Sequence, residues 1–272
     1  MSLRLVLSAL GLSLMSGPAQ AARDWQVRDW QVGLQAPVTP VMERLSHFHT
    51  ELVWIVTAIC VLVAGLLVTV MVRFNSRTHQ VPSKTHHNTA LEMMWTLAPV
   101  IILVIIAIPS FKLLYYEADI PKPDVTIQAV GHQWYWTYVY PKDGGFQFDS
   151  NMLPETAAKQ AGKPRLLGTD NPVVVPVNKN VEVITTGADV IHSWAVPAFG
   201  VKMDAIPGRL NHTWFRATRE GTYYGQCSEL CGANHAFMPI EVKVVSEPAY
   251  RAWLAMAKKK YAADDTARVA SN

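Results

Sequence analysis

Residues 52–72 read LVWIVTAICVLVAGLLVTVMV, a run of 21 residues without a charged side chain. At 1.5 Å per residue a helix of this length covers about 30 Å, the thickness of the hydrocarbon core of a bilayer. A second apolar run of 19 residues follows at 93–111. Buried core helices are the alternative, but such lengths are typical of membrane spans. The two runs predict a transmembrane hairpin over residues 47–116, with spans at about 50–73 and 92–112.

The connection between the runs, residues 73–91, carries Arg73, Arg77 and Lys84 and no acidic residue. Because the cytoplasmic loops of membrane proteins are enriched in Lys and Arg, this connection is predicted to lie in the cytoplasm. Both ends of the mature chain then lie outside. Glu92 falls at the cytoplasmic mouth of the second span, either as an interfacial charge or as a collector of protons.

The first 21 residues have the layout of a secretory signal peptide. A single arginine precedes a short apolar run, and Ala19-Gln20-Ala21 supplies the small residues of a cleavage site. An uncleaved anchor helix is the alternative, although the apolar run is short for a bilayer. Together with the loop charges, the signal peptide predicts a multi-pass protein of a bacterial inner membrane. Residues 22–46 then form an N-terminal periplasmic segment.

From residue 117 to residue 248 the chain changes character. Short stretches typical of strands are separated by Pro, Gly, Asn and Asp, at 124–130, 134–140, 173–177, 181–186, 190–196, 210–217, 222–226 and 240–245. This pattern predicts an all-β domain, an antiparallel sandwich or barrel. Residues 249–272 predict a terminal helix and basic tail with Lys258, Lys259 and Lys260. The net charge of the whole chain, +3, gives no indication of nucleic acid binding.

One loop between two predicted strands carries the chemistry. Residues 225–238 read GQCSELCGANHAFM and contain Cys227, Cys231, His235 and Met238. Thiolate, thioether and imidazole together favour a soft metal such as copper. A mononuclear electron-transfer copper site needs two histidines, one cysteine and a weak axial methionine. A second histidine must therefore come from another strand.

His192 is the best candidate for this second histidine, ahead of His132 and His212. The extra cysteine of the loop is compatible with three kinds of site. The two cysteines form a disulfide, as exported domains permit, or join two histidines around zinc, or bridge two copper ions that each have their own histidine. The third cysteine, Cys60, lies in the first span and is interpreted as a small apolar residue.

A second cluster, GHQWYW at 131–136, is rich in aromatic residues. Its ordinary interpretation is sandwich core, although an exposed tryptophan beside a metal could take up electrons. Together with IHSWAVPAFGVKMDAIPGR at 191–209 and YYGQCSELCGANHAFMP at 223–239, it resembles subunit II of the haem–copper cytochrome c oxidases. The resemblance covers about residues 40–248. It implies a two-helix transmembrane hairpin followed by an all-β, cupredoxin-like Greek-key barrel with a binuclear copper A centre.

The resemblance also implies the role of each site residue. The copper ligands would be the bridging Cys227 and Cys231, one histidine per copper from His192 and His235, the weak ligand Met238, and the backbone carbonyl of Glu229. The side chain of Glu229 would help to bind a magnesium ion shared with subunit I. Trp134 would take up electrons, and Glu92 would lie at the mouth of a proton channel.

The partners follow from the same resemblance. Asp204 and Arg209 match residues that face subunit I near its haem propionates. Acidic residues that attract the lysine-rich face of cytochrome c would be Asp149, Asp170 and Asp189. Positions 139 and 188, acidic in some relatives, are neutral here, so the docking surface is predicted to be weaker or its partner different. A third subunit is also expected, and the haem would lie only in subunit I.

The implied function is to accept electrons from reduced cytochrome c and pass them to haem a of subunit I. Oxygen reduction to water and proton pumping would take place in that subunit, so this chain would not be catalytic alone. A quinol oxidase subunit is one alternative, but its barrel has lost the copper ligands that are present here. A membrane-tethered copper carrier or sensor is another. A nitrous oxide reductase domain could share the loop but would not need two spans.

Overall fold

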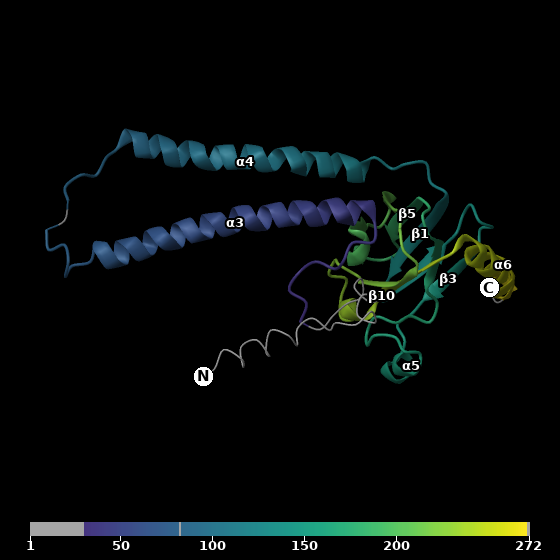
Figure 1. Ribbon diagram of the computed structural model, residues 1–272. Helices are drawn as coiled ribbons and strands as arrows, with labels where there is room; N and C mark the ends of the chain where they lie inside the picture. Colours follow the sequence, from purple (N-terminus) through teal and green to yellow (C-terminus); the bar gives the residue numbers. More distant parts are fainter. Residues whose placement is uncertain (1–29, 82, 271–272) are drawn as a thin grey trace, which may run out of the picture. The chain divides into compact units, whose positions relative to one another are not determined.

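The computed structural model describes residues 30–81 and 83–270, with the backbone alone for 262–270 (Figure 1). The predicted signal peptide, residues 1–21, lies outside the described residues. Contacts divide the chain into two compact units. One runs from Glu43 to Asp119, and the other contains residues up to Met42 together with those from Ile120 onward. Each unit is described by itself.

Two long helices form the first unit. Helix α3 spans Pro40–Arg73 and helix α4 spans Thr89–Ala118, and both are long and apolar enough to cross a membrane. None of the most apolar stretch of either helix is buried within the described chain. The prediction of two apolar helices is confirmed, and each helix runs several residues beyond the predicted span.

The helix ends are defined by local chemistry. Thr39 precedes α3, and its hydroxyl oxygen accepts a hydrogen bond from the backbone N–H of Met42 at 3.0 Å, while Pro40 occupies the first helical position. Asn88 caps α4 by accepting from the N–H of Leu91 at 3.1 Å. Helix α4 contains Pro99 and Pro109, as expected of a membrane helix.

The second unit is a β domain whose strands make three sheets. The strands are β1 (Val125–His132), β2 (Tyr135–Val139), β3 (Gln147–Ser150), β4 (Val173–Pro176), β5 (Val181–Gly187), β6 (His192–Val196), β7 (Val201–Ala205), β8 (Asn211–Phe215), β9 (Gly221–Gln226) and β10 (Pro239–Val245). The sheet orders are β3-β2-β1-β5-β8, β4-β10-β9 and β6-β7. Strand β7 also lies beside β8, and β6 beside β9, so the sheets follow one another around a rolled structure.

Two features of the sheets differ from the sequence prediction. Strand β1 pairs with β5, and β4 with β10, in parallel, whereas the sequence pattern predicts an antiparallel arrangement. Strands β3 and β7 are absent from the prediction. The alternation of side chains identifies a strand but carries no information about the direction of its partner, which is decided by contacts far apart in the chain. Both missed strands are short, four and five residues.

Aromatic residues fill the core of the domain. Trp136, Tyr138 and Tyr140 are completely buried, so the sandwich-core interpretation of the aromatic cluster at 131–136 is confirmed for Trp136. The two tyrosines, one on the same strand and one just after it, extend the core. The indole N–H of Trp194 donates to the hydroxyl of Tyr138 at 3.2 Å, which satisfies a polar group in the interior. The core places rigid strands directly behind the loop that carries Cys227.

Three short helices and one long C-terminal helix complete the described part of the domain. They are α5 (Glu155–Gln160), η2 (Pro197–Phe199), η3 (His235–Phe237) and the terminal α6 (Glu247–Ala270). Helix α6 packs its aromatic face on the sheet: Trp253 lies 5.3 Å from Tyr140, and Tyr261 lies 4.9 Å from Phe148, between ring centroids. Figure 1 shows α6 beside β3 at the C-terminal end of the chain. The predicted terminal helix is thus part of the folded domain.

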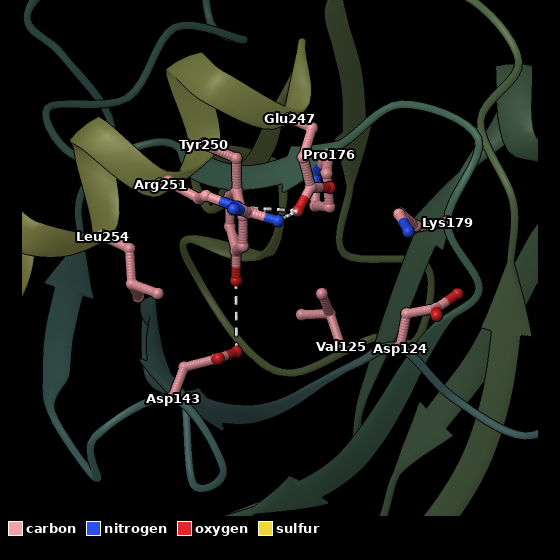
Figure 2. Close-up of a pocket in the computed structure, with 9 residues that line it drawn as sticks. All are labelled: Asp124, Val125, Asp143, Pro176, Lys179, Glu247, Tyr250, Arg251 and Leu254. Carbon is pink, nitrogen blue, oxygen red and sulfur yellow. Dashed lines mark hydrogen bonds and ion pairs between the residues drawn. The ribbon is translucent and has the colours of Figure 1, made fainter.

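A cavity of about 260 Å³ lies beneath the start of α6 (Figure 2). The hydroxyl of Tyr250 donates to Asp143 across it at 3.1 Å, and Arg251 pairs with Glu247 at its rim at 3.0 Å. The first residue of β1, Val125, lines this cavity. The cavity is therefore at the opposite end of β1 from Gly131, which lies against the ring of His192.

Candidate metal centre

Five sulfur and nitrogen ligands meet at one end of the β domain. Cys227 Sγ lies 3.8 Å from Cys231 Sγ and 3.9 Å from His192 Nδ1. Cys231 Sγ lies 3.5 Å from His235 Nδ1 and 3.6 Å from Met238 Sδ. His192, Cys227 and Cys231 alone bring three donor atoms within 4.8 Å of one another. Each sulfur of the pair therefore has its own imidazole.

Strands hold this cluster from two sides. The histidine at the start of β6 faces the loop between β9 and β10, and the backbone N–H of Ser228 donates to the carbonyl of Ser193 at 3.0 Å. The N–H of Cys227 donates to the carbonyl of Met238 at 3.4 Å, which closes the loop on itself. The indole N–H of Trp136 donates to the same carbonyl at 3.4 Å. The buried core thus fixes both ends of the loop.

Both cysteines of the cluster are free thiols in the structure. Their sulfurs are far beyond the roughly 2.05 Å of a disulfide bond, so the disulfide reading is not what the structure contains. The thioether of Met238 joins the set, and three soft sulfur donors with two imidazoles favour copper over zinc. The donor chemistry therefore fits a copper centre.

The charges of the two thiols are coupled. Burial raises the pKa of Cys227, but contact with the His192 ring and with nearby backbone groups outweighs burial, so the net pKa is lowered. The pKa of Cys231 is raised by burial and by the negative charge on Cys227. A bound cation between the sulfurs would remove this conflict and let both exist as thiolates.

Asp189 fixes the orientation of His192. Its carboxylate accepts hydrogen bonds from His192 Nε2 at 2.8 Å, from the N–H of Val190 at 2.6 Å and from the N–H of Gln133 at 2.7 Å. With Nε2 held in this way, Nδ1 faces the sulfur of Cys227. Burial lowers the pKa of His192, but its contacts with Cys227 and Asp189 outweigh burial and raise it.

Gly131 of β1 provides the space for that ring. A Cβ at this position would lie 2.7 Å from Cγ and Cδ2 of His192, closer than non-bonded carbon atoms approach. The edge of the ring also meets Trp136, with 6.0 Å between centroids. The sequence identified His192 but not the space that Gly131 provides, since these two residues are 61 positions apart. The support from Asp189 was also missed, although this residue lies only three positions before His192 and its spacing could have indicated the contact.

Trp134 lies against the loop at Cys231. Its indole N–H donates to the carbonyl of Cys231 at 3.2 Å, and the side chain of Gln133 donates to the same carbonyl at 2.8 Å. Trp134 is partly buried. The tryptophan singled out from the sequence is thus joined by one hydrogen bond to Cys231, a residue of the sulfur and nitrogen cluster.

The backbone of Glu229 contacts the cluster, although the residue is exposed. Its carbonyl oxygen lies 3.4 Å from Cys227 Sγ, whereas the residue itself is exposed. The other two candidate histidines stand apart from the cluster. His132 stacks on Tyr135 at 4.6 Å between ring centroids, and His212 pairs with Glu182 at 3.0 Å.

The remaining residues implied by the resemblance do not join the cluster. In α4, the carboxylate of Glu92 accepts a hydrogen bond from His87 Nδ1 at 2.8 Å. Asp204 and Arg209 are exposed. The Asp149 carboxylate accepts from the hydroxyl of Thr137 at 2.7 Å. Asp170 is exposed, and its carboxylate accepts from the N–H groups of residues 151 and 171 at 2.8 and 2.7 Å. Cys60 is exposed on α3.

These observations define a class: a protein with two membrane-spanning helices and a β domain that presents a soft-metal centre at one end. Comparison with known proteins agrees. The family model "Cytochrome C oxidase subunit II, periplasmic domain" matches residues 125–245, and "Cytochrome C oxidase subunit II, transmembrane domain" matches residues 27–113.

Individual relatives extend the match over most of the chain. A probable cytochrome c oxidase subunit 2 of Rickettsia bellii is 48% identical over 267 residues, covering 98% of each chain. Cytochrome c oxidase subunit 2 of Zea mays is 47% identical and covers 83% of this chain and 88% of its own. The solved periplasmic domain of subunit II of Bradyrhizobium japonicum cytochrome oxidase is 59% identical and covers 53% of this chain and 99% of its own, with a TM-score of 0.49.

The chain belongs to the cytochrome c oxidase subunit II family. It is a membrane protein and a subunit of a cytochrome c oxidase complex, with a Cys/His cluster that fits a copper A site. The prediction of two apolar helices followed by an all-β domain is confirmed by the described elements and by the two family models.

Proposed function

We propose that the cluster is the binuclear copper A centre of this subunit. The proposed ligands are the side chains of His192, Cys227, Cys231, His235 and Met238 and the backbone carbonyl of Glu229. The observation that carries the proposal is the pair of sulfurs 3.8 Å apart, each with the Nδ1 of a different histidine beside it. One metal would need only one pair of a sulfur and an imidazole, whereas two metals would use both pairs.

When bound, copper supplies a centre that gains and loses one electron at a time. The chain's own residues supply rigidity and exclude water. Cys227, Cys231 and Met238 are between 1% and 5% exposed. Because their positions are fixed by strands on both sides, little has to rearrange when the charge changes. The site is therefore suited to electron transfer.

Reduced cytochrome c is the proposed electron donor, and Trp134 is the proposed point of electron uptake. The hydrogen bond from its indole to the Cys231 carbonyl supports this role, since it links the tryptophan directly to a ligand residue. Asp149, Asp170 and Asp189 are the proposed docking acids. Asp189 has a second role, because its carboxylate also holds His192.

Subunit I is the proposed acceptor of the electrons, at haem a, and the site of oxygen reduction to water and of proton pumping. Asp204 and Arg209 are proposed to face this subunit. The exposed side chain of Glu229 is proposed to share a magnesium ion with it. Because the carbonyl of this residue lies beside Cys227 while the residue itself is exposed, it can serve both metals. Subunit III is a further proposed partner.

Glu92 is proposed as the mouth of a proton channel. Its carboxylate lies at the start of α4, 2.8 Å from His87 and 3.3 Å from the N–H of Asn88. An imidazole can both donate and accept a hydrogen bond through its two ring nitrogens, so this neighbour is suited to relay a proton to the carboxylate.

The location that we propose is a bacterial inner membrane, with the copper domain in the periplasm. The proposed division of the chain is a signal peptide at 1–21, a periplasmic segment at 22–46, a transmembrane hairpin at 47–116, the copper domain at 117–248 and the terminal helix and tail at 249–272. The basic connection at 73–91 supports this orientation.

The test uses the intact oxidase purified from membranes. We expect two coppers in this subunit, a mixed-valence electron paramagnetic resonance signal and oxidation of cytochrome c. A single copper, or none, contradicts the proposed centre. Oxidation of a quinol in preference to cytochrome c would instead indicate a quinol oxidase, and rapid loss of copper to a chelator would indicate a copper carrier or sensor.

A further inference from the structure

Helix α6 begins after residue 245, where the match to the periplasmic-domain family model ends. Its lysines at 258–260 have no part in the proposed copper site. The end of this segment is anchored: the ring of Tyr261 is 8% exposed and stacks on Phe148, and its hydroxyl donates to Asn171 Oδ1 at 3.1 Å. The position of the neighbouring lysine is therefore set by packing.

Lys260 is exposed, and its ammonium donates to the same oxygen of Asn171 at 3.3 Å. It also lies over the ring of Tyr261, 4.7 Å from the centroid. Asn171 in turn contacts both neighbouring acids. Its backbone N–H donates to the carboxylate of Asp170 at 2.7 Å, and its side chain donates to the carbonyl of Asp149 at 3.0 Å.

This arrangement places a fixed positive charge beside two of the proposed docking acids. The contacts through Asn171 hold the ammonium of Lys260 within about one Debye length, about 10 Å at 0.1 M salt, of the Asp170 carboxylate. At that range the two charges oppose each other in the field that an approaching protein meets.

We propose that Lys260 determines donor specificity at the docking surface, by weakening its attraction for a strongly lysine-rich cytochrome and favouring a donor with a less basic face. The inference rests on the proposed docking of cytochrome c at Asp149 and Asp170. Electrostatic complementarity acts mainly on the association rate, so the effect belongs to kcat/KM and to affinity rather than to kcat.

The chain offers a matched control one residue away. Lys259 is also exposed, carries the same charge and lies about 100° around the helix from Lys260. Lys259→Gln and Lys260→Gln remove the same net charge. Glutamine at 260 keeps N–H groups that can donate to Asn171, so the helix anchor at Tyr261 is preserved. Equal melting temperatures for the two variants verify this.

The experiment uses the assembled oxidase with each substitution. Steady-state oxidation is measured with a lysine-rich and an acidic cytochrome c, and affinity is measured with the oxidised cytochromes, which do not turn over. For the lysine-rich donor we expect Lys260→Gln to raise kcat/KM and affinity about two- to threefold at low salt, with kcat unchanged and the gain lost near 0.5 M salt. For the acidic donor both values fall. Lys259→Gln has less than half of either effect.

Equal effects of the two substitutions would overturn the proposal, because net charge alone would then explain them. No effect of Lys260→Gln would overturn it as well. Asp170→Asn, measured in parallel, separates a failure of the proposed role of Lys260 from a failure of the proposed docking of cytochrome c at the acidic residues. If Asp170→Asn leaves the lysine-rich donor unaffected, the acids are not the docking surface. If it weakens that donor while Lys260→Gln changes nothing, only the role of Lys260 fails.

Discussion

The two histidines of the cluster are held in different ways. His192 belongs to strand β6, is fully buried, and has its outer nitrogen fixed by Asp189. His235 lies in the short helix η3 within the loop and is partly exposed. Its backbone N–H bonds only within the loop, to the carbonyl of Gly232 at 3.2 Å. One half of the centre is built on the sheet and the other on the loop.

Because of this difference, we expect the two halves of the cluster to contribute unequally to metal binding. The half with Cys227 and His192 is pre-organised by the core, so it binds without further ordering of the backbone. In the half with Cys231, His235 and Met238 the two sulfurs are buried, but His235 lies in the loop and is partly exposed, so its ring must be ordered by the metal. Substitutions in the two halves should therefore have unequal consequences.

The largest expected effect comes from removing one bridging thiol. In Cys231→Ser the bridged centre is lost, because a hydroxyl is a poor ligand for a soft metal. We expect at most one copper, bound by Cys227 and His192, and no mixed-valence signal. In Cys227→Ser, which leaves only the loop half, we expect weaker copper binding still. Metal analysis after dialysis against a chelator measures both.

Cys60→Ser is the control for these variants, since this thiol lies on α3. It should retain both coppers. Tighter residual copper in Cys227→Ser than in Cys231→Ser would show that the loop half is the better ordered one and would reverse the comparison.

A second prediction adds bulk behind the strand-held histidine. Gly131→Ala places a Cβ 2.7 Å from the His192 ring, which must move. Such overpacking typically costs about 1–3 kcal/mol of stability, and here it also displaces Nδ1 from Cys227. We expect an altered copper spectrum and a lower melting temperature. Gly33→Ala, which meets no atom within 4 Å, should change neither.

An unchanged copper spectrum in Gly131→Ala would mean that the His192 ring adjusts without moving its donor nitrogen. The strand half would then be no more rigid than the loop half, and the comparison between them would lose its basis.

The same contrast explains how much the sequence could predict. The two apolar helices follow from unbroken runs of residues, and the loop ligands from their spacing of four, four and three residues along the chain. His192 could be proposed only because the loop lacked a second histidine. Gly131 contacts His192 through the fold, and a pattern local to one segment carries no sign of such a contact. The parallel pairing of β1 with β5 escaped prediction for the same reason. Asp189 lies three residues before His192, but acidic residues are so common in loops that its spacing alone did not reveal the hydrogen bond.

A third prediction concerns the support of His192. The Asp189 carboxylate accepts three hydrogen bonds, whereas an asparagine side chain at this position would turn an amide N–H₂ toward at least one of the donors. Because outer hydrogen bonds fix metal ligands, Asp189→Asn should weaken copper binding about 10- to 100-fold and shift the reduction potential of the centre. Competition with a chelator and redox titration measure these two effects.

Asp170→Asn is the matched control, since both backbone donors reach the same carboxylate oxygen, which asparagine retains. It should leave copper affinity and potential unchanged. Equal copper affinities in the two variants would show that Asp189 acts only as a surface charge.

The smallest structural change is expected at Trp134, which contacts the loop half. Its indole N–H donates to the carbonyl of Cys231 in the loop, while the adjacent Gln133 donates its backbone N–H to Asp189 on the strand side. Trp134→Phe removes one hydrogen bond to a carbonyl that Gln133 still contacts. We therefore expect copper content, spectrum and potential to stay as they are, and electron uptake from cytochrome c to slow. Stopped-flow reduction measures uptake, with Trp95→Phe on α4 as the control. Unchanged uptake would remove the proposed role of Trp134, whereas an altered copper spectrum would show that the indole supports the loop half of the centre.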